Sequence, residues 1–333
     1  MVRLPADALM EMLRAAGEPT RLRVLALLAQ EELAVLELGR VLGQSQPRVS
    51  RHLKLLAEAG LVDRFADGAW AFYRLAAAEP ARTLADAVLS LADPCDPVLA
   101  ADRERLAAVR AERAAQAADY FARNAPRWAE IRSLHVDEAE VEAAILRAAG
   151  PGPFRRLLDL GTGAGRMLTL LGGRARSGLG LDLSRSMLNI ARSETAAAGL
   201  AEVELRHGDI LATGLPAGFA DLVIVHRVLH YLSEPAAALA EAARLVAPGG
   251  RLLVVDFAPH GLEQLRDQHQ HRRLGFADEE IVPSLAAAGL RPQAPAVLPP
   301  ASPDGLTVKI WSAVRPGTPA AAPAPRAAER AIV

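Results

Sequence analysis

Residues Arg155–Arg166 read RRLLDLGTGAGR, and this stretch decides the fold of the larger part of the chain. The apolar run Leu157–Leu160 predicts a buried strand, and Arg166–Leu171 predicts a helix. A nucleotide-like ligand could approach bare backbone at the three glycines between them, because a side chain there would occupy its space. A glycine turn of this kind is common, so the interpretation depends on the strands later in the chain.

The later predicted strands are mostly apolar, and a polar residue comes at or shortly after the end of most of them. They are Gly178–Leu181 before Asp182, Val203–Arg206 before Asp209, Phe219–Val225 before His226, and a last apolar run at Leu252–Phe257. An acidic residue at the tip of the second strand of a βαβ unit, here Asp182, is placed to bind both hydroxyls of a ribose. The pattern therefore predicts parallel strands alternating with helices.

This order of strands, turns and acidic tips resembles the class I S-adenosylmethionine-dependent methyltransferases over about residues 120–315. The resemblance implies an α/β, Rossmann-like domain with a mostly parallel seven-stranded sheet. It also implies S-adenosylmethionine as cofactor, with S-adenosylhomocysteine as product or effector, and no metal. The residues that it assigns to the cofactor are Asp159, Gly161, Thr162, Gly163, Gly165, Asp182, Leu183, Met187, Asp209, Ile210 and His226.

The resemblance also gives these residues their parts in binding. Asp159 and the glycine backbone would hold the methionine part, and Asp182 the ribose. The adenine would pack on two residues and hydrogen-bond to the Asp209 side chain and the following amide. The packing residues are Leu183 and Met187, and the amide is that of Ile210.

Methyl transfer needs a nucleophile held in line with the methyl carbon, and a base where the acceptor loses a proton. The candidates are His226, His230 and Tyr231, although the last two could equally cap and pack a helix. Two histidine pairs, His226 with His230 and His269 with His271, lack a third ligand at suitable spacing, so no metal site is expected. Nothing in the sequence identifies the methyl acceptor.

The N-terminal part has a different pattern, of short helices and then a hairpin. The predicted helices are Ala8–Ala16, Pro19–Leu28, Ala34–Leu42 and Gln46–Ala59. Ser45 is the expected N-cap of the last of these. Two β-rich runs, Leu61–Phe65 and Ala69–Leu75, flank an Asp-Gly turn and predict a hairpin.

The words GEPTRLR (17–23) and SQPRVSRHLKLLAEAGLV (45–62) resemble the ArsR/SmtB transcription repressors. The resemblance implies an α+β winged helix-turn-helix whose helix from Gln46 enters the major groove of double-stranded operator DNA. It implies a homodimer through the first helix and the helix after the wing. The expected DNA-binding residues are Ser45, Gln46, Arg48, Ser50, Arg51, His52, Lys54 and Arg64.

The sequence departs from that family at the positions with which its metal-sensing members bind their metal ion. Metal-sensing members carry a Cys-x-Cys pair where this chain has Ala34 and Leu36, which cannot bind a soft metal. The predicted helix Ala81–Ala92 holds no histidine for a zinc site either. We therefore expect the winged helix to take its signal from the second domain.

The composition indicates the number of domains, the compartment and the classes of partner. A chain of 333 residues with 51% apolar and 23% charged residues is expected to form two ordinary domains, and its net charge of −1 favours neither nucleic acid nor membrane as a whole. The lone Cys95 suits a reducing cytoplasm, argues against arsenite methylation and has no assigned role. No apolar stretch reaches about 18 residues, so no membrane contact is expected.

The expected domains are a DNA-binding and dimerisation domain at 1–92, a helical connector at 93–119, a methyltransferase domain at 120–315 and a disordered Pro/Ala-rich tail at 316–333. The break Asp93–Pro97 precedes a long helix predicted at Val98–Arg123. Residues Tyr120–Trp128 resemble a segment that covers the cofactor in such enzymes. Later elements are expected as helices at His260–Gly275 and Asp278–Ala288 and a strand at Leu306–Val314.

Two functions fit this organisation. One is a transcriptional regulator with a cofactor-binding and active methyltransferase domain, in which the state of the cofactor changes the affinity for DNA. The other is a small-molecule methyltransferase whose winged helix serves autoregulation or dimerisation. Intact binding residues fit both functions, and specific substrate machinery would favour the second.

Overall fold

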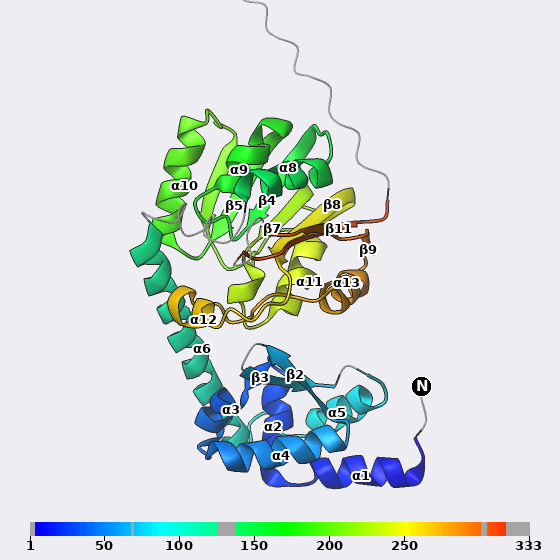
Figure 1. Cartoon of the computed structure of the whole chain (residues 1–333). Coiled ribbons are helices and arrows are strands. Elements are labelled where there is room, and N and C mark those ends of the chain that lie inside the picture. The colour runs from blue at the N-terminus through cyan, green and yellow to red at the C-terminus, as the bar shows by residue number, and fades with distance from the viewer. Residues whose placement is uncertain (1–3, 68–69, 77, 126–136, 301–304, 318–333) are drawn as a thin grey trace, which may run out of the picture. The chain divides into compact units, whose positions relative to one another are not determined.

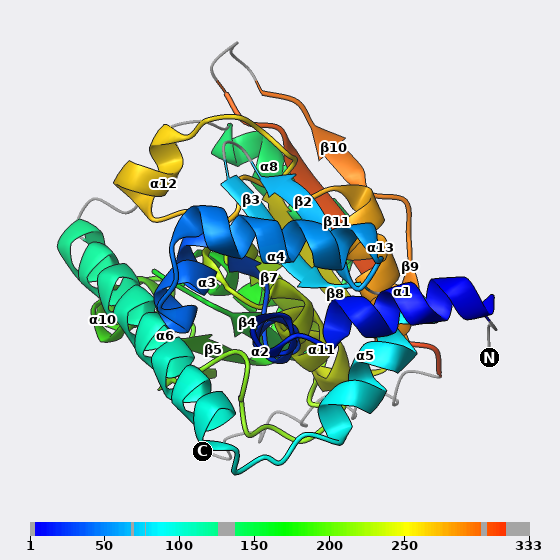
Figure 2. The ribbon, with the colours of Figure 1, turned by 90° about the horizontal axis from the view of Figure 1, so that it is seen from below.

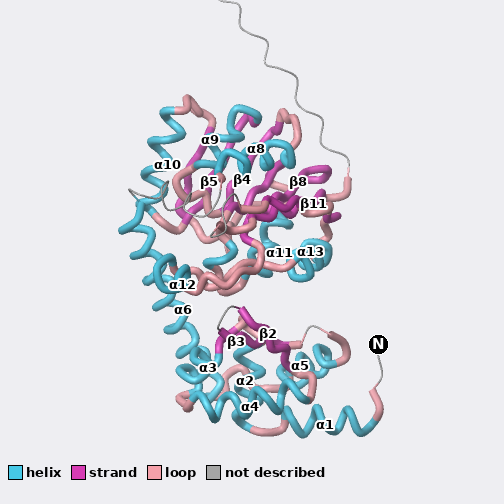
Figure 3. Tube along the Cα trace, in the orientation of Figure 1, coloured by secondary structure: helices cyan, strands magenta, loops and turns pink. Residues whose placement is uncertain are grey.

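The computed structural model describes residues 4–67, 70–76, 78–125, 137–300 and 305–317 (Figure 1). The chain divides into two compact units. The first unit contains Met1–Tyr120 together with two later pieces, Tyr231–Glu234 and Pro259–Leu274. The second unit contains the rest, and Figure 3 shows its strands alternating with helices.

The first unit begins with four helices and a small antiparallel sheet in the order β1-β3-β2, which is a winged helix-turn-helix. A two-residue strand, β1, was not expected from the sequence. It pairs with the hairpin through Leu33 opposite Tyr73. The elements are α1 (Ala6–Ala16), α2 (Pro19–Leu28), β1 (Leu33–Ala34), α3 (Val35–Leu42), α4 (Gln46–Glu58), β2 (Val62–Asp67), β3 (Trp70–Leu75), α5 (Ala81–Ser90) and α6 (Pro97–Asn124).

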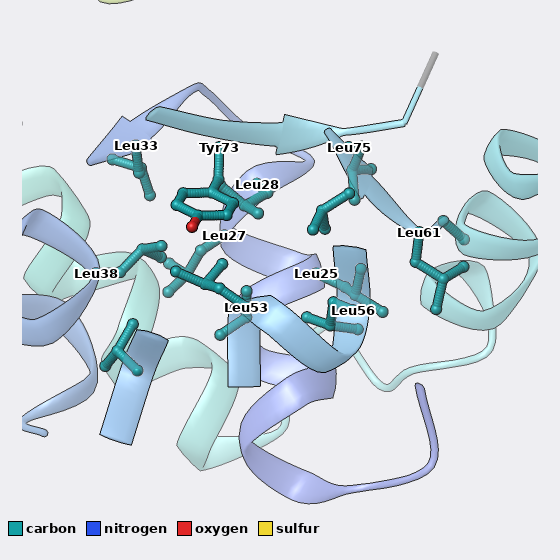
Figure 4. Packing of buried hydrophobic residues seen from close by; sticks show 14 of the residues in the cluster. Leu25, Leu27, Leu28, Leu33, Leu38, Leu53, Leu56, Leu61, Tyr73 and Leu75 are labelled. Carbon is teal, nitrogen blue, oxygen red and sulfur yellow. The ribbon is translucent and has the colours of Figure 1, made fainter. Parts of the chain in front are cut away.

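The core of this unit forms where α4 faces the other helices. Val49, Leu53 and Leu56 recur every three or four residues on α4, so they lie on one face, and all three are fully buried. Figure 4 shows Leu53 and Leu56 in this core. The first half of α6 joins the same core through Leu106 and Val109. This part of the predicted connector helix therefore packs on the winged helix.

Ser45 occupies the predicted position before α4, but its side chain makes no capping hydrogen bond. The prediction of Ser45 as the N-cap residue is therefore confirmed in position, whereas its hydroxyl forms no capping hydrogen bond. Its carbonyl instead accepts the amides of Arg48 and Val49, and the exposed hydroxyl is left for solvent or a ligand.

The second unit is built on one sheet. Its elements are α8 (Glu138–Ala149), β4 (Phe154–Leu160), α9 (Arg166–Leu171), η2 (Gly172–Arg174), β5 (Ala175–Asp182), α10 (Arg185–Ala197), β6 (Val203–His207), β7 (Ala220–His226), η3 (Leu229–Tyr231), α11 (Pro235–Leu245), β8 (Val246–Phe257), α13 (Asp278–Ala287), β9 (Arg291–Pro292), β10 (Ala296–Leu298) and β11 (Val308–Val314). The element α12 (Gln264–His269) lies in the piece that belongs to the first unit.

The sheet runs β10-β11-β8-β7-β4-β5-β6, and β9 pairs with β11 as an eighth strand. Strands β8, β7, β4, β5 and β6 are parallel, and β11 is antiparallel to β8. This is the expected Rossmann-like architecture, with the short strand β9 in addition. Because the parallel strands share one direction, the residues just beyond their carboxyl ends meet at one edge of the sheet.

One predicted helix is shorter in the structure, and two other predicted segments extend beyond the described residues. The helix expected at His260–Gly275 is only the short α12, because Gln270 adopts a left-handed conformation with φ of 59° and ends it. Residues 126–128 of the predicted covering segment and 318–333 of the predicted tail lie outside the described residues. Among the described helices, none has the length and apolar character to span a membrane.

Candidate functional site

The glycine-rich turn after β4 is held by the neighbouring strand. The amides of Gly161 and Thr162 both donate to the carbonyl of Leu181, at 2.8 and 2.9 Å. Gly161 has φ of 75°, and a Cβ there would lie 2.4 Å from Cγ2 of Val228. The structure thus adds a second reason for glycine: at this position the protein itself fills the space.

Asp159, at the end of β4, is the buried acid of the site. Its side chain is 1% exposed, and Oδ2 accepts the hydroxyl of Thr162 at 2.6 Å. Among the described residues, Oδ1 has no hydrogen-bond partner. Burial raises the pKa of the carboxyl to about 7, and the Asp182 carboxylate adds to the shift, against the hydrogen bond from Thr162. A buried carboxyl with an open acceptor fits a cationic group such as an α-ammonium.

Asp182 joins the tip of β5 to the glycine turn. Its Oδ2 accepts the amide of Gly163 at 2.8 Å, and its Oδ1 accepts the amide of Ser184 at 2.7 Å. Burial raises its pKa, and the two amide donors oppose that shift. The next residue, Leu183, is 58% exposed, whereas Met187 on α10 is buried. An anchored carboxylate beside an exposed apolar side chain suits a ribose with an attached base.

The next two strands bring their polar residues to the same edge. Asp209 comes after β6, is half-buried and accepts the amide of Leu211 at 2.9 Å, and Ile210 is buried. His226 ends β7, where it pairs in register with Val255 of β8. Four neighbouring strands, in the order β7-β4-β5-β6, thus have a polar residue at or just after their carboxyl ends. In the same order these residues are His226, Asp159, Asp182 and Asp209.

His230 lies in η3 and is 1% exposed. Its Nδ1 is 2.7 Å from Oδ1 of Asp256, which is fully buried at the end of β8, and its ring lies 5.3 Å from that of Phe257. These contacts favour the packing role over the catalytic one. The boundary between the units falls inside η3, so that its last residue, Tyr231, belongs to the first unit, where it lies edge-on to His271 with ring centroids 5.4 Å apart.

Two residues of this region were missed from the sequence. Asp256 repeats the pattern of an acid ending an apolar strand, so the signal was present. Arg227 gave no such signal. It has φ of 53°, donates its amide to the carbonyl of Val255 at 2.7 Å and forms a partly buried ion pair with Glu138. Its positive φ marks backbone strain at the end of β7, and such strain concentrates at functional sites.

The candidate DNA interface is the outer face of α4 (Figure 2). Arg48, Arg51 and Lys54 are exposed there, as are the two residues that begin the helix region, Ser45 and Gln46. Ser50 is half-buried. Arg64 is exposed on β2 of the wing. These positions give a basic surface beside a helix that can enter a major groove.

His52 differs from the other expected DNA-binding residues. Its side chain is 14% exposed, and its Nδ1 lies 3.4 Å from Oε2 of Glu18, the N-cap residue of α2. The ring therefore faces the start of α2. A direct base contact by His52 would need a change of rotamer.

The first unit also exposes apolar side chains on α1. Leu9, Met10 and Leu13 are 39, 45 and 40% exposed, and Leu91 after α5 is 87% exposed. Three exposed apolar side chains on one short helix are costly to leave in water and suit an interface. No group of three or more metal-ligating side chains occurs among the described residues.

Residues 18–64 match the family described as bacterial regulatory protein, arsR family, and residues 158–254 match the family described as methyltransferase domain. The chain therefore combines an ArsR-type helix-turn-helix domain with a methyltransferase domain.

A demethylmenaquinone methyltransferase of Thermus thermophilus is 39% identical over 107 residues, which cover 32% of this chain and 48% of that protein. A ubiquinone biosynthesis O-methyltransferase of Paracidovorax citrulli is 30% identical over 136 residues, which cover 39% of this chain and 56% of that protein. The match thus spans about half the length of each curated relative.

A chain in the complex between the Haloferax volcanii Trm112 methyltransferase activator and a methyltransferase has a similar fold, with a TM-score of 0.50 and 21% identity. The similarity covers 59% of this chain and 97% of that one.

Proposed function

We propose that the protein is an ArsR-type transcriptional regulator whose methyltransferase domain binds S-adenosylmethionine or S-adenosylhomocysteine and couples the state of the cofactor to DNA binding. The observation that carries the proposal is the presence in one chain of an exposed basic recognition helix and a set of buried and anchored acids suited to this cofactor. A reducing, DNA-containing compartment, the cytoplasm, is its proposed location.

The residues of the second unit fit the cofactor part by part. The open acceptor of Asp159 would bind the α-ammonium, and the Asp182 carboxylate the ribose hydroxyls. Leu183 and Met187 would pack the adenine, whose edge would meet Asp209 and the amide of Ile210. The backbone of Gly161, Thr162, Gly163 and Gly165 would line the approach. When bound, S-adenosylmethionine supplies an electrophilic methyl carbon, and His226 at the end of β7 is the proposed contact for an acceptor.

The first unit would bind operator DNA as a homodimer. Arg48, Arg51, Lys54 and Arg64 provide charge for phosphates and guanine edges. A single winged helix neutralises few phosphates, so two copies give useful affinity. The exposed apolar residues of α1 are proposed to join the two copies.

A second candidate is a small-molecule methyltransferase in which the winged helix serves autoregulation or dimerisation. The quinone-pathway names of the two curated relatives support an acceptor of aromatic or quinone type for this alternative. In either function the domain is proposed to be catalytically competent.

The test is binding of the purified protein to DNA upstream of its own gene, at fixed salt, titrated separately with each cofactor form. We expect one form to change the dissociation constant by tenfold or more, a coupling of about 1.4 kcal/mol. Arg51→Ala should weaken DNA binding about tenfold and leave cofactor affinity unchanged, whereas the exposed Arg192→Ala on α10 should change neither. Cofactor binding without any shift in DNA affinity would reject the coupling and favour the second candidate.

A further inference from the structure

The piece Pro259–Leu274, here termed the arginine arm, leaves the sheet after β8 and returns before α13. It belongs to the first unit although both of its ends continue into the second. The arm carries three arginines, Arg266, Arg272 and Arg273. All three meet acidic or aromatic side chains of the winged helix, so the arm is fastened to that domain at several points.

Arg272 makes the most extensive of these contacts. Its Nη1 donates to Oε1 of Glu37 at 2.7 Å, and its Nη2 donates to Oε2 of Glu37 at 3.1 Å and to the carbonyl of Glu32 at 3.0 Å. The Arg272 and Glu37 side chains are 11 and 10% exposed. A bidentate pair shielded from water is stronger and more directional than a surface ion pair.

Glu37 is also part of the start of α3. Its Oε2 accepts the amide of Ala34, which precedes the helix, at 2.8 Å. The same carboxylate therefore fixes the first turn of α3 and receives the arm. Helix α3 packs directly on the recognition helix α4, through a core that contains Leu38 and Leu53. A displacement of the Glu37 carboxylate would therefore affect α3, the helix on which the recognition helix α4 packs.

The other two arginines cover the aromatic face of the wing. The guanidinium of Arg273 lies 4.9 Å from the ring centre of Phe65 and pairs with Glu32 at 3.0 Å. The guanidinium of Arg266 lies 5.2 Å from the ring centre of Trp70. Cations over aromatic rings are held by the ring quadrupole, more strongly where water is excluded. The arm therefore contacts both the wing and α3.

Charge around Glu37 makes this contact sensitive to the position of the arm. Burial raises the pKa of Glu37, but Arg272 and then Arg113 outweigh it, so the pKa stays below its ordinary value. Arg113 of α6 lies 3.2 Å from the same carboxylate, and burial and the nearby Arg272 lower the pKa of Arg113. Withdrawing Arg272 would leave Glu37 with one of its two cations and would change the balance at the start of α3.

We propose that the arginine arm is the coupling element between the two activities. The arm begins three residues after Asp256, the acid at the end of β8 that holds His230. A change of ligand at this edge of the sheet alters where the arm leaves β8, and Arg272 passes the change to Glu37, α3 and α4. The inference rests on the proposed function, because it specifies how cofactor state would reach DNA affinity.

The test compares coupling in the unaltered full-length protein and in Arg272→Gln, with S-adenosylhomocysteine and S-adenosylmethionine as probes. We expect the tenfold or greater effect of cofactor on the DNA dissociation constant to fall below about twofold in the variant. The affinity of the variant for cofactor should be unchanged. Gln268→Ala alters an exposed residue of the same arm and should keep the full coupling.

Two further variants distinguish loss of the Arg272–Glu37 contact from a general folding defect. Arg272→Lys keeps the charge and loses the bidentate geometry, and should give intermediate coupling. Glu37→Gln keeps an acceptor for the Ala34 amide, and should lose coupling to the same extent as Arg272→Gln, with no further loss when the two are combined. Full coupling in Arg272→Gln would overturn the role of the arm. Absence of coupling in the unaltered protein would instead overturn the proposed function, and with it the need for a coupling element.

Discussion

The amide of Gly163 donates to Oδ2 of Asp182 across 2.8 Å, so the acid at the tip of β5 holds the glycine turn after β4. Asp182, which is proposed to bind the ribose, therefore also holds the glycine turn in place. Asp182→Ala should weaken cofactor binding at least tenfold, because it removes both the ligand for the hydroxyls and the anchor of the turn. Isothermal titration with S-adenosylhomocysteine measures this. DNA affinity without cofactor should not change, and full cofactor affinity would contradict the assignment.

The raised pKa of Asp159 predicts how cofactor affinity depends on pH. The carboxyl must be ionised to accept an ammonium group, and its pKa in the folded protein is about 7. Affinity should therefore fall as pH is lowered from 8 to 6, approaching about tenfold per unit below the pKa, and binding should release protons there. Titrations in buffers of different ionisation enthalpy check this, and in Asp159→Asn the pH dependence should disappear.

The same group should make the protein without cofactor less stable at higher pH. Its pKa is raised above the ordinary value of 3.8, so the folded state holds the proton more tightly than the unfolded chain. The resulting stabilisation is fully present below about pH 4 and is lost as pH rises towards 7. Asp159→Asn should remove this loss, as measured by urea unfolding at pH 5 and pH 8. An equal pH dependence in the variant would place the effect on another group.

Gly161→Ala tests whether contact with Val228, in addition to the positive φ, requires glycine at this position of the turn. The new Cβ would lie 2.4 Å from Cγ2 of Val228, and φ is 75°. We expect a loss of about 2–4 kcal/mol in the free energy of unfolding, from the clash and the left-handed backbone together. Gly199→Ala is the matched control, because its φ is 69° and nothing lies within 4 Å of its Cβ. The control should lose about 1 kcal/mol. Equal losses in the two variants would show that the cost comes from the left-handed backbone alone and not from the contact with Val228.

The buried pair between Arg23 of α2 and Asp102 of α6 should stabilise the winged helix unit. Arg23 Nε is 2.6 Å from Asp102 Oδ2, and the Asp102 side chain is 3% exposed. Asp102→Ala should cost about 3 kcal/mol, because it leaves a largely buried guanidinium without this partner. The exposed pair Arg82–Asp86 is the control, and Asp86→Ala should cost less than about 0.5 kcal/mol. Denaturant unfolding of both variants gives the comparison; similar losses would show that burial of the pair is unimportant.

The sequence by itself determined the element types, because they depend on local periodicity and turn chemistry. The apolar runs at Leu157–Leu160 and Leu252–Phe257 became β4 and part of β8, and Pro19 begins α2 as predicted. The motif acids Asp159, Asp182 and Asp209 were placed at strand ends because parallel strands bring such residues to one edge. Ser45 is the N-cap residue of α4 as predicted, but its hydroxyl forms no capping hydrogen bond, because that bond depends on where the hydroxyl points and sequence spacing does not specify this.

Only the tertiary structure decided which residues become partners across the chain. His230 was a candidate base in sequence, and its contact with Asp256 arises because η3 and the end of β8 are brought together by the sheet. Arg272 and Glu37 are separated by 235 positions, and nothing in the composition of the arm indicated its docking on α3. Local patterns determine secondary structure, whereas long-range ion pairs depend on how loops leave the elements they connect.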